Sequence, residues 1–252
     1  AVNVAHILAW DHKQRVLLID CDSQCNATEF FGIAPTEDDV TLDDVLLGDC
    51  EPYYAENITP TAYENLDMIP ASDGLMDLDM SHIADKRVHG RVLADLCSAI
   101  REDDAYDYVI FDCPPAFNAA SAAALLASDS VIIPIKLDAF SLRGLANVRR
   151  QIENIRRINA GIEIAGALIT MWRNVPVVLE AERALRDSGV LPVFQTVIRR
   201  TDKVDEMTFR QVPILVSSPY SAAGYDYRNF VQELLEPQLT MDDMEGGTDD
   251  GI

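Results

Sequence analysis

The chain has 252 residues, 48% of them hydrophobic, and a formal net charge of −22 at pH 7. This length allows a sizeable core, in one large α/β domain or two small ones. No apolar run approaches the roughly 20 residues of a membrane span, and we expect no signal peptide. The five cysteines include no CxxC pair. They therefore predict no disulfide framework, and we expect a protein of the reducing cytoplasm.

The negative charge is unevenly distributed along the chain. Residues 1–85 hold 2 basic and 18 acidic residues, whereas residues 136–228 hold 14 basic and 10 acidic ones. An anionic partner should therefore meet the region 136–228. Residues 237–252 are acidic and lack aromatic residues, so we expect a disordered tail there. Such a tail is the opposite of a basic membrane anchor, and we expect no membrane partner.

Hydrophobic periodicity and turn signals predict helices that alternate with strands. In chain order these are a helix over 1–10, a strand over 16–19, a short strand within 64–72 at the domain edge, a helix around 88–102, a strand within 107–115, a helix over 119–127, a strand over 131–135, a helix over 141–158, a strand over 165–170, a helix over 176–187, a strand over 192–198 and a last helix around 222–235. This order predicts one α/β domain over residues 1–236, with a mainly parallel sheet flanked by helices on both faces.

Two apolar strands end on carboxylates. VLLIDCDSQCN, residues 16–26, places Asp20 and Asp22 after one strand, and DYVIFDCPP places Asp112 at the end of another. Ligands of parallel sheets collect beyond the carboxyl ends of the strands. A carboxylate at this position is the Walker B arrangement, which holds the Mg²⁺ that bridges nucleotide phosphates. The alternative is a strand that simply stops at an acidic turn.

Five segments in this order resemble the ParA/Soj branch of the deviant Walker ATPases, which also include MinD. They are VLLIDCDSQCNAT, DYVIFDCPPAFN, DSVIIPIKLDAFSLRGL, ALITMW and TVIRRTDKVDE. The resemblance covers residues 1 to about 236. It implies an ATP hydrolase that partitions plasmids, chromosomes or mobile elements, with ATP and Mg²⁺ as cofactors. It also implies that ATP binding produces a homodimer. The implied partners are non-specific DNA and a ParB-like centromere-binding protein, and the implied location is the nucleoid within the cytoplasm.

The resemblance also implies roles for single residues. Asp22 would orient or activate the water that attacks the γ-phosphate, Asp20 would support it, and Asp112 would bind Mg²⁺ through a water molecule. The family's proline-arginine-asparagine turn, which cradles the adenine, falls on Arg199, Arg200 and Thr201, where two of the three residues differ. Arg199 and Thr201 are the predicted nucleotide contacts. The family's D-P-Q-G-N reads DSQCN here, which replaces a rigid proline and a permissive glycine.

The largest departure from the family is the missing P-loop. Members open with a strand and K-G-G-x-G-K-T-T, whose amides and lysines hold the phosphates, and no such sequence occurs here. AVNVAHILA, residues 1–9, resembles the family segment directly after that loop. We therefore expect a chain truncated at its N-terminus, without the first strand of its fold, and inactive as given. The alternative is a nucleotide-free interaction module that binds a partition partner or DNA.

Basic residues in the C-terminal third are the predicted DNA contacts, namely Arg200, Lys203, Arg210 and Arg228. In the related proteins basic residues of that region bind DNA phosphates without sequence preference. The alternative is a solvated basic surface. A MinD-like membrane positioner is a further rival, and the acidic tail argues against it. An iron–sulfur member of the superfamily is disfavoured because Cys97 falls in a predicted helix and Cys113 in the turn after a strand.

Overall fold

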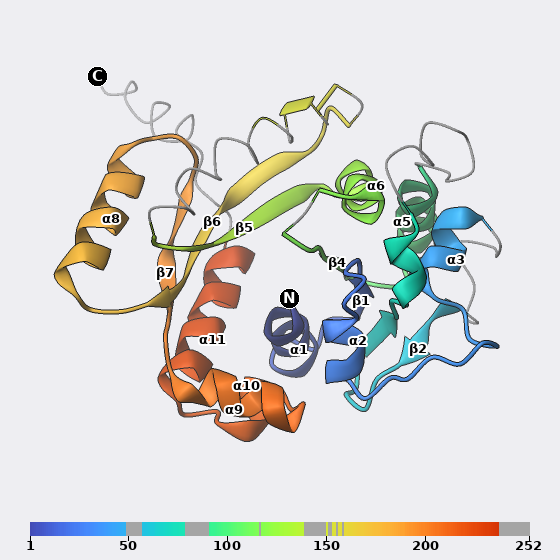
Figure 1. Cartoon of the computed structure of the whole chain (residues 1–252), viewed down its shortest axis with the longest axis horizontal. Helices are drawn as coiled ribbons and strands as arrows, with labels where there is room; N and C mark the ends of the chain where they lie inside the picture. The colour runs from blue at the N-terminus through green and yellow to red at the C-terminus, as the bar shows by residue number, and fades with distance from the viewer. Residues whose placement is uncertain are drawn as a thin grey trace, which may run out of the picture.

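Figure 1 shows a computed structural model of the chain. The structure describes residues 1–48, 57–78, 91–115, 117–138, 150, 153–154, 156–157 and 159–236. The described α-helices are α1 (Val2–Trp10), α2 (Asn26–Phe30), α3 (Leu42–Leu47), α5 (Val92–Glu102), α6 (Ala119–Ala127), α8 (Pro176–Asp187), α9 (Asp202–Arg210), α10 (Ile214–Ser217) and α11 (Ala222–Leu235), and a short 3₁₀ helix, η2, spans Asp73–Met76. The described strands are β1 (Val16–Asp20), β2 (Thr59–Pro60), β3 (Leu66–Ile69), β4 (Tyr108–Asp112), β5 (Ser130–Lys136), β6 (Glu163–Trp172) and β7 (Val193–Arg199).

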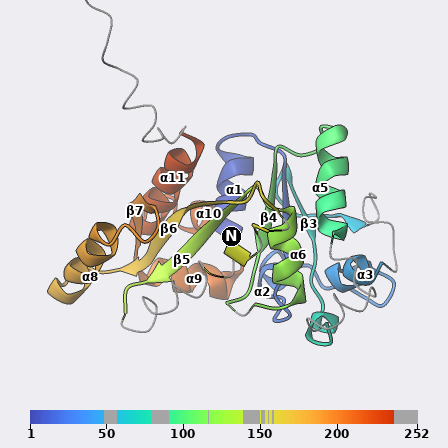
Figure 2. The same ribbon diagram turned by 90° about the horizontal axis from the view of Figure 1, so that it is seen from above.

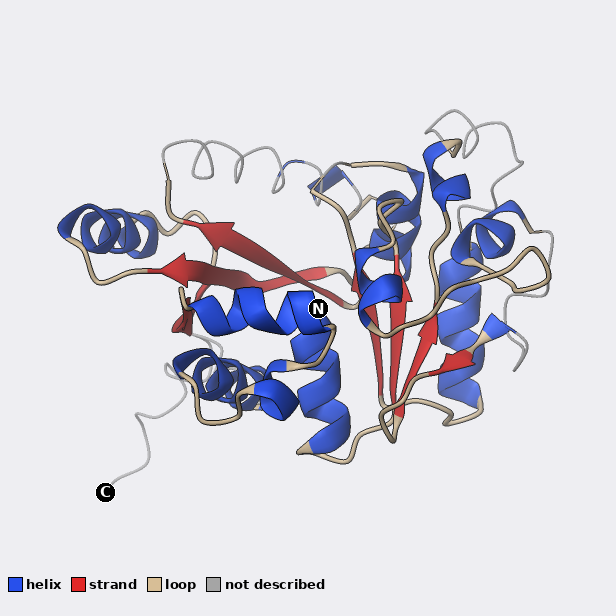
Figure 3. Cartoon of the chain, turned by 60° about the horizontal axis from the view of Figure 1, so that its bottom comes forward, coloured by secondary structure: helices blue, strands red, loops and turns tan. Residues whose placement is uncertain are grey.

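The strands form two sheets. The first sheet has the order β2-β3-β1-β4, in which β1 pairs in parallel with β3 and with β4, and β2 is antiparallel to β3. The second sheet has the order β5-β6-β7 and is parallel throughout. Figure 3 shows the strands of the two sheets pointing in different directions. β4 and β5 end their sheets, and each has one bonded neighbour among the described strands.

Helices cover both faces of the first sheet because the side chains of β1 alternate between two cores. Leu17 and Ile19 face a core that includes residues of α3, α5 and α6. Val16 and Leu18 face the opposite core, which includes residues of α1, α9, α10 and α11. All five residues of β1 are buried, as expected for an inner strand of a parallel sheet.

Asn3 fastens α1 to the C-terminal helices. Its side-chain oxygen accepts a hydrogen bond from the backbone N–H of Ile214 at 3.0 Å, and its amide nitrogen lies 3.3 Å from the sulfur of Met207. Asn3 is 4% exposed, and a polar side chain so deeply buried needs such partners. The first helix thus packs against segments more than 200 residues away in the sequence.

The second sheet carries its own small core. Phe194 of β7 and Phe230 of α11 meet edge to face, with ring centroids 4.9 Å apart. Gly166 of β6 adopts a φ of +156°, and a Cβ atom there would lie 3.0 Å from the Phe194 ring. Glycine is therefore required at this position, where the ring packs against the strand. α8 and α5 lie at opposite ends of the molecule (Figures 1 and 2).

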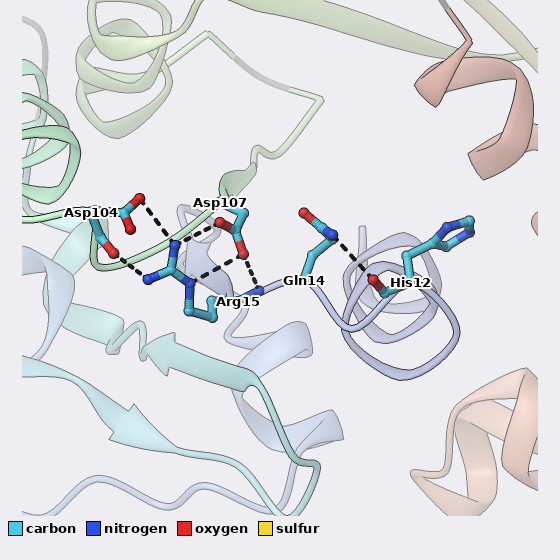
Figure 4. Close-up of polar contacts among 5 residues, drawn as sticks. All are labelled: His12, Gln14, Arg15, Asp104 and Asp107. Carbon is cyan, nitrogen blue, oxygen red and sulfur yellow. Dashed lines mark hydrogen bonds and ion pairs between the residues drawn. The ribbon is translucent and has the colours of Figure 1, made fainter.

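Arg15 ties the start of β1 to the loop that precedes β4 (Figure 4). Its guanidinium donates to both carboxylate oxygens of Asp107, at 2.7 and 3.2 Å, and to the carboxylate and carbonyl oxygens of Asp104. The backbone N–H of Arg15 also donates to Asp107 at 2.7 Å. These hydrogen bonds hold the pKa of Asp107 below its usual value. The contact fixes β1 beside β4, which sets the register at their carboxyl ends.

The predicted fold class and most predicted elements are confirmed. The helix over 119–127 and the helix over 176–187 have the predicted bounds. The strand predicted within 64–72 is not at the edge of the sheet, because β3 lies between β1 and β2. α2, α3, α9 and α10 were not predicted. The predicted helix over 141–158, apart from a few of its residues, and the predicted disordered tail over 237–252 lie outside the described residues.

Candidate active site

Asp20 and Asp112 lie side by side at the carboxyl edge of the first sheet. They are register partners in the parallel pair of β1 and β4, and the ladder continues with a hydrogen bond of 2.9 Å from the N–H of Cys21 to the carbonyl of Asp112. Asp22 follows two residues after β1. We call this set of carboxylates, Asp20, Asp22 and Asp112, the acid edge. The prediction that they share one edge is confirmed, while their catalytic and metal-binding roles stay predictions.

Both oxygens of the Asp20 carboxylate accept hydrogen bonds from groups of its own chain. Oδ2 accepts hydrogen bonds from the N–H and the hydroxyl of Thr28, at 2.9 and 2.8 Å, and Oδ1 accepts one from the N–H of Asp22 at 3.1 Å. Asp20 is 0% exposed. Burial raises its pKa, aided by the charge of Asp112 and opposed by these hydrogen bonds. Asp20 therefore holds the turn that carries Asp22, and each of its oxygens already has a partner within the chain.

Thr28 joins the acid edge to a third strand. Its hydroxyl oxygen, which donates to Asp20, also accepts a hydrogen bond of 2.9 Å from the N–H of Ala71, just beyond β3. Thr28 is 1% exposed. No motif or periodicity marks Thr28 in the sequence, although its hydroxyl group lies only six positions after Asp22. The turn after β1 is thus attached to β1 itself and to the chain leaving β3.

Asp22 is the more accessible acid of the turn. Its Oδ1 accepts a hydrogen bond of 3.0 Å from the N–H of Gln24, which is the local pattern of an Asx turn. Three residues on, Cys25 adopts a left-handed conformation with φ of 53° just before α2. Glycine adopts this conformation without the steric cost that a side chain brings. Cys25, which stands where the family pattern has glycine, therefore holds this conformation at a steric cost that glycine would not have.

Asp112 is the acid that best fits a metal ligand. It is half-buried at the end of β4, and no hydrogen bond or ion pair of its carboxylate is found among the described residues. Mg²⁺ prefers carboxylate oxygens and keeps several water molecules, so one carboxylate acting through water suffices. After the two prolines, Asn118 caps α6 by accepting a hydrogen bond of 2.9 Å from the N–H of Ser121.

The predicted adenine turn lies at the carboxyl end of the second sheet. The guanidinium of Arg199 binds the buried carboxylate of Asp226 at 2.6 Å and also donates to the carbonyl of Ala222. The N–H of Arg200 donates to the carbonyl of Trp172 at 2.9 Å. The hydroxyl of Thr201 caps α9. Arg199 therefore has a structural partner that the sequence did not reveal, and its predicted nucleotide contact stays a prediction.

A family model described as an AAA domain matches residues 1–164. The sporulation initiation inhibitor protein Soj of Bacillus subtilis is 31% identical over 93% of this chain and 91% of its own length. The chromosome partitioning protein ParA of Caulobacter vibrioides is 32% identical over 93% of this chain and 87% of its own length. The chain belongs to the ParA/Soj family.

Solved structures share the fold of this ParA/Soj chain. The McdA(D38A)–ATP complex of Cyanothece is 22% identical, with a TM-score of 0.79 over 95% of this chain and 93% of that one. Cobyrinic acid a,c-diamide synthase of Mycobacterium smegmatis with bound ADP and magnesium is 26% identical, with a TM-score of 0.75 over 92% and 86%. MinD of Pyrococcus horikoshii complexed with Mg-ADP is 22% identical, with a TM-score of 0.72 over 93% and 88%. These matches agree with the predicted α/β fold.

The predicted DNA contacts of the ParA/Soj chain differ in their surroundings. Lys203 forms an ion pair of 2.8 Å with Glu206, and Arg228 forms one of 2.7 Å with Asp11. Arg200 and Arg210 are exposed, and neither forms an ion pair within the described part of the chain, although the charge of Arg210 helps Lys203 to lower the pKa of Glu206. Arg200, Lys203 and Arg210 belong to one continuous segment, whereas Arg228 lies on α11. Their DNA contacts stay predictions.

No described helix has both the length and the apolar character needed to cross a membrane.

Proposed function

We propose that this chain is the body of a ParA-type partition ATPase that uses ATP and Mg²⁺. The observation that carries the proposal is the placement of Asp20 and Asp112 as register partners, with Asp22 held at the same edge by Asp20. Membership of the ParA/Soj family supports it. ATP would join two protomers, the dimer would bind DNA without sequence preference, and a ParB-like protein would stimulate hydrolysis in the nucleoid-associated, cytoplasmic protein.

The roles at the acid edge divide according to what each carboxylate already contacts. Asp22 orients the attacking water, because it is partly exposed and keeps one oxygen without a described partner. Asp112 holds Mg²⁺ through a water molecule. When bound, the ion supplies charge that stabilises the phosphoryl group in transfer. Asp20 positions Asp22 through the hydrogen bond from the Asp22 N–H.

Hydrolysis also requires a phosphate cradle, and the 252 residues contain no K-G-G-x-G-K-[ST] sequence. Oriented amides and a lysine supply most of the phosphate affinity and charge stabilisation in such sites. β4 and β5 each leave one side unpaired among the described strands. A parallel strand between them would join the two sheets, and its carboxyl end would lie beside Asp112. We therefore propose that activity depends on a strand and P-loop segment in that place.

The experiment compares the 252-residue chain with the same chain preceded by a strand and K-G-G-x-G-K-T-T. Phosphate release is measured with and without Mg²⁺, and dimerisation with ATP is followed by analytical ultracentrifugation. We expect no Mg²⁺-dependent hydrolysis by the shorter chain and slow turnover by the longer one. In the longer chain, Asp22→Ala should abolish turnover while ATP binding persists. Hydrolysis by the shorter chain above a buffer control would overturn the proposed need for the cradle.

A nucleotide-free interaction module is the second candidate function. It is favoured by the Arg199–Asp226 ion pair, which occupies the guanidinium at the expected adenine turn. This candidate predicts that neither chain binds ATP in equilibrium dialysis, while both bind DNA or a partition partner. ATP binding by the longer chain would exclude it.

A further inference from the structure

Two cysteines follow the paired ends of β1 and β4. Asp20 and Asp112 are register partners, and the N–H of Cys21 donates to the carbonyl of Asp112 at 2.9 Å. The parallel ladder therefore runs one residue beyond the strands. Cys21 and Cys113 are the next pair along it. We call them the dithiol pair.

Their side chains share one face of the sheet. Leu17, Ile19 and Cys21 belong to the same buried core, as expected for alternate residues of a strand. Val109 and Phe111 of β4 pack against that core, and Cys113 is the next residue in this alternation. The neighbouring Cys113 thiol and burial both raise the pKa of Cys21, as expected for side chains that follow each other on one face.

The spacing of the strands suits a disulfide bond. Neighbouring strands lie about 4.8 Å apart, and disulfides join Cα atoms that are roughly 4.4 to 6.8 Å apart. Both thiols are free. No other pair of cysteines in the described residues occupies neighbouring positions on two strands. Cys97 lies within α5, and Cys25 lies in the turn before α2.

The two thiols differ in access. Cys113 is exposed, whereas Cys21 is 0% exposed beneath the strand ends. A reagent from solution therefore reaches Cys113 first. A thiol beside the site of attack can then displace the reagent from the mixed disulfide, as in ordinary thiol–disulfide exchange.

We propose that Cys21 and Cys113 form a redox modification site that is oxidised by a low-molecular-weight disulfide. Cys113 attacks one sulfur of oxidised glutathione, which forms a mixed disulfide and releases one glutathione thiol. The sulfur of Cys21 then attacks the sulfur of Cys113 and releases the second glutathione thiol. The two cysteines lose two electrons and two protons. The two glutathione molecules gain these electrons and protons as they are released in their thiol form.

This bond would act on the acid edge directly. Cys21 stands between Asp20 and Asp22, and Cys113 follows Asp112. Closing the bond ties the two strand ends together at the point where their carboxylates are placed. Reduction by a dithiol such as dithiothreitol would reverse it. The site thus gives the acid edge a covalent response to the thiol–disulfide balance, whether or not nucleotide is bound.

The test treats the purified full chain with oxidised glutathione and measures intact mass and non-reduced peptide maps. We expect a mass lower by two hydrogen atoms and one linked peptide pair that contains Cys21 and Cys113. Cys97→Ser, the matched control, should behave as the parent does. Cys113→Ser should form no such link. Because Cys113 is exposed, this variant is expected to fold, which circular dichroism checks.

Cys21→Ser separates the two steps. It should stop at a stable glutathione adduct on Cys113, and the parent should pass through this adduct only transiently. A parent chain that keeps the adduct without closing the ring would overturn the proposal. A link between Cys21 and Cys25 in the parent, which Cys25→Ser would remove, would overturn it as well.

Discussion

The hydroxyl and the backbone N–H of Thr28 both donate to Oδ2 of Asp20, at 2.8 and 2.9 Å. This double contact accounts for a carboxylate that is completely buried next to a second acid. The same hydroxyl accepts a hydrogen bond from the N–H of Ala71. Loss of this oxygen would therefore remove one hydrogen-bond partner from the Asp20 carboxylate and one from the Ala71 N–H. Leaving buried polar groups unpaired costs more than the net gain of one hydrogen bond.

Thr28→Val should therefore destabilise the chain by about 1 to 3 kcal/mol. Valine has nearly the shape of threonine and replaces the hydroxyl with a methyl group. Thr28→Ser, which keeps the hydroxyl, is the matched control and should lose less. Urea denaturation followed by circular dichroism measures both changes. Equal losses for the two variants would mean that packing of the methyl group, rather than the Asp20 contact, stabilises this position.

The buried side chain of His6 should make the free energy of unfolding depend on pH. His6 of α1 is 0% exposed, and neither ring nitrogen has a hydrogen-bond partner among the described residues. Its ring meets the edge of Tyr63 at 4.8 Å between centroids. Burial lowers the pKa of His6 from 6.5 to about 4, against a smaller raising effect of Asp11. The folded state therefore keeps His6 neutral at pH values where the unfolded chain is protonated.

Stability should consequently fall as the pH drops from about 6.5 to about 4, because the unfolded state binds the proton first. The contribution of His6 over this range is roughly 3 kcal/mol. His6→Leu should make the free energy of unfolding less dependent on pH over the same interval. Urea titrations at about pH 7 and about pH 5, on either side of the ordinary histidine pKa, give the two values. A variant as pH-dependent as the parent would contradict the assignment to His6.

The side chain of Asn159 should stabilise the fold at a place far from the acid edge. The two N–H groups of its side-chain amide are shared among three carbonyls at the end of α6, those of Leu125, Leu126 and Ser128, which lie 3.1, 3.1 and 2.9 Å from the nitrogen. The last carbonyls of a helix have no partner within the helix. Asn159→Ala should therefore destabilise the chain by about 1 to 2 kcal/mol. Asn159→Asp should cost more, because its carboxylate cannot donate and places negative charge at a helix C-terminus. Thermal unfolding of both variants at neutral pH measures the order.

The sequence predicted those elements whose apolar residues recur with a clear period. β1 is a run of Val, Leu and Ile and is wholly buried, and α6 is rich in alanine and is capped by Asn118. α9 was missed because only Met207 among its nine residues is buried, so no apolar stripe marks it. α10 is four residues long, too short for a period to emerge.

At the candidate site, the sequence predicted which acids meet but not what each one binds. The carboxyl ends of neighbouring parallel strands share an edge, so strand order alone brings Asp20 to Asp112. The partners Thr28 and Asp226 depend on side-chain packing between elements that are distant in the sequence. No periodicity carries that information. Arg199 illustrates the consequence, since its ion pair with Asp226 spans 27 positions.

The last prediction concerns which basic residues contact DNA. Lys203 and Arg228 are held by Glu206 and Asp11, so their release to a phosphate would break an existing ion pair. Arg200 and Arg210 are exposed, and the residues that the structure describes give them no such partner. The latter two should therefore supply more of the phosphate affinity.

In the protein that carries a P-loop segment, with ATP bound, Arg200→Ala with Arg210→Ala should weaken binding to every duplex alike. It should also flatten the plot of log affinity against log salt by about 2 for each protomer, since each phosphate contact contributes about 0.9 to the slope. Lys203→Ala with Arg228→Ala should change the slope less. Arg101→Ala, an exposed arginine of α5 paired with Asp129, controls for loss of charge alone. Fluorescence anisotropy with two unrelated duplexes at several salt concentrations decides between them. A slope unchanged by the first pair of substitutions would place the DNA surface elsewhere.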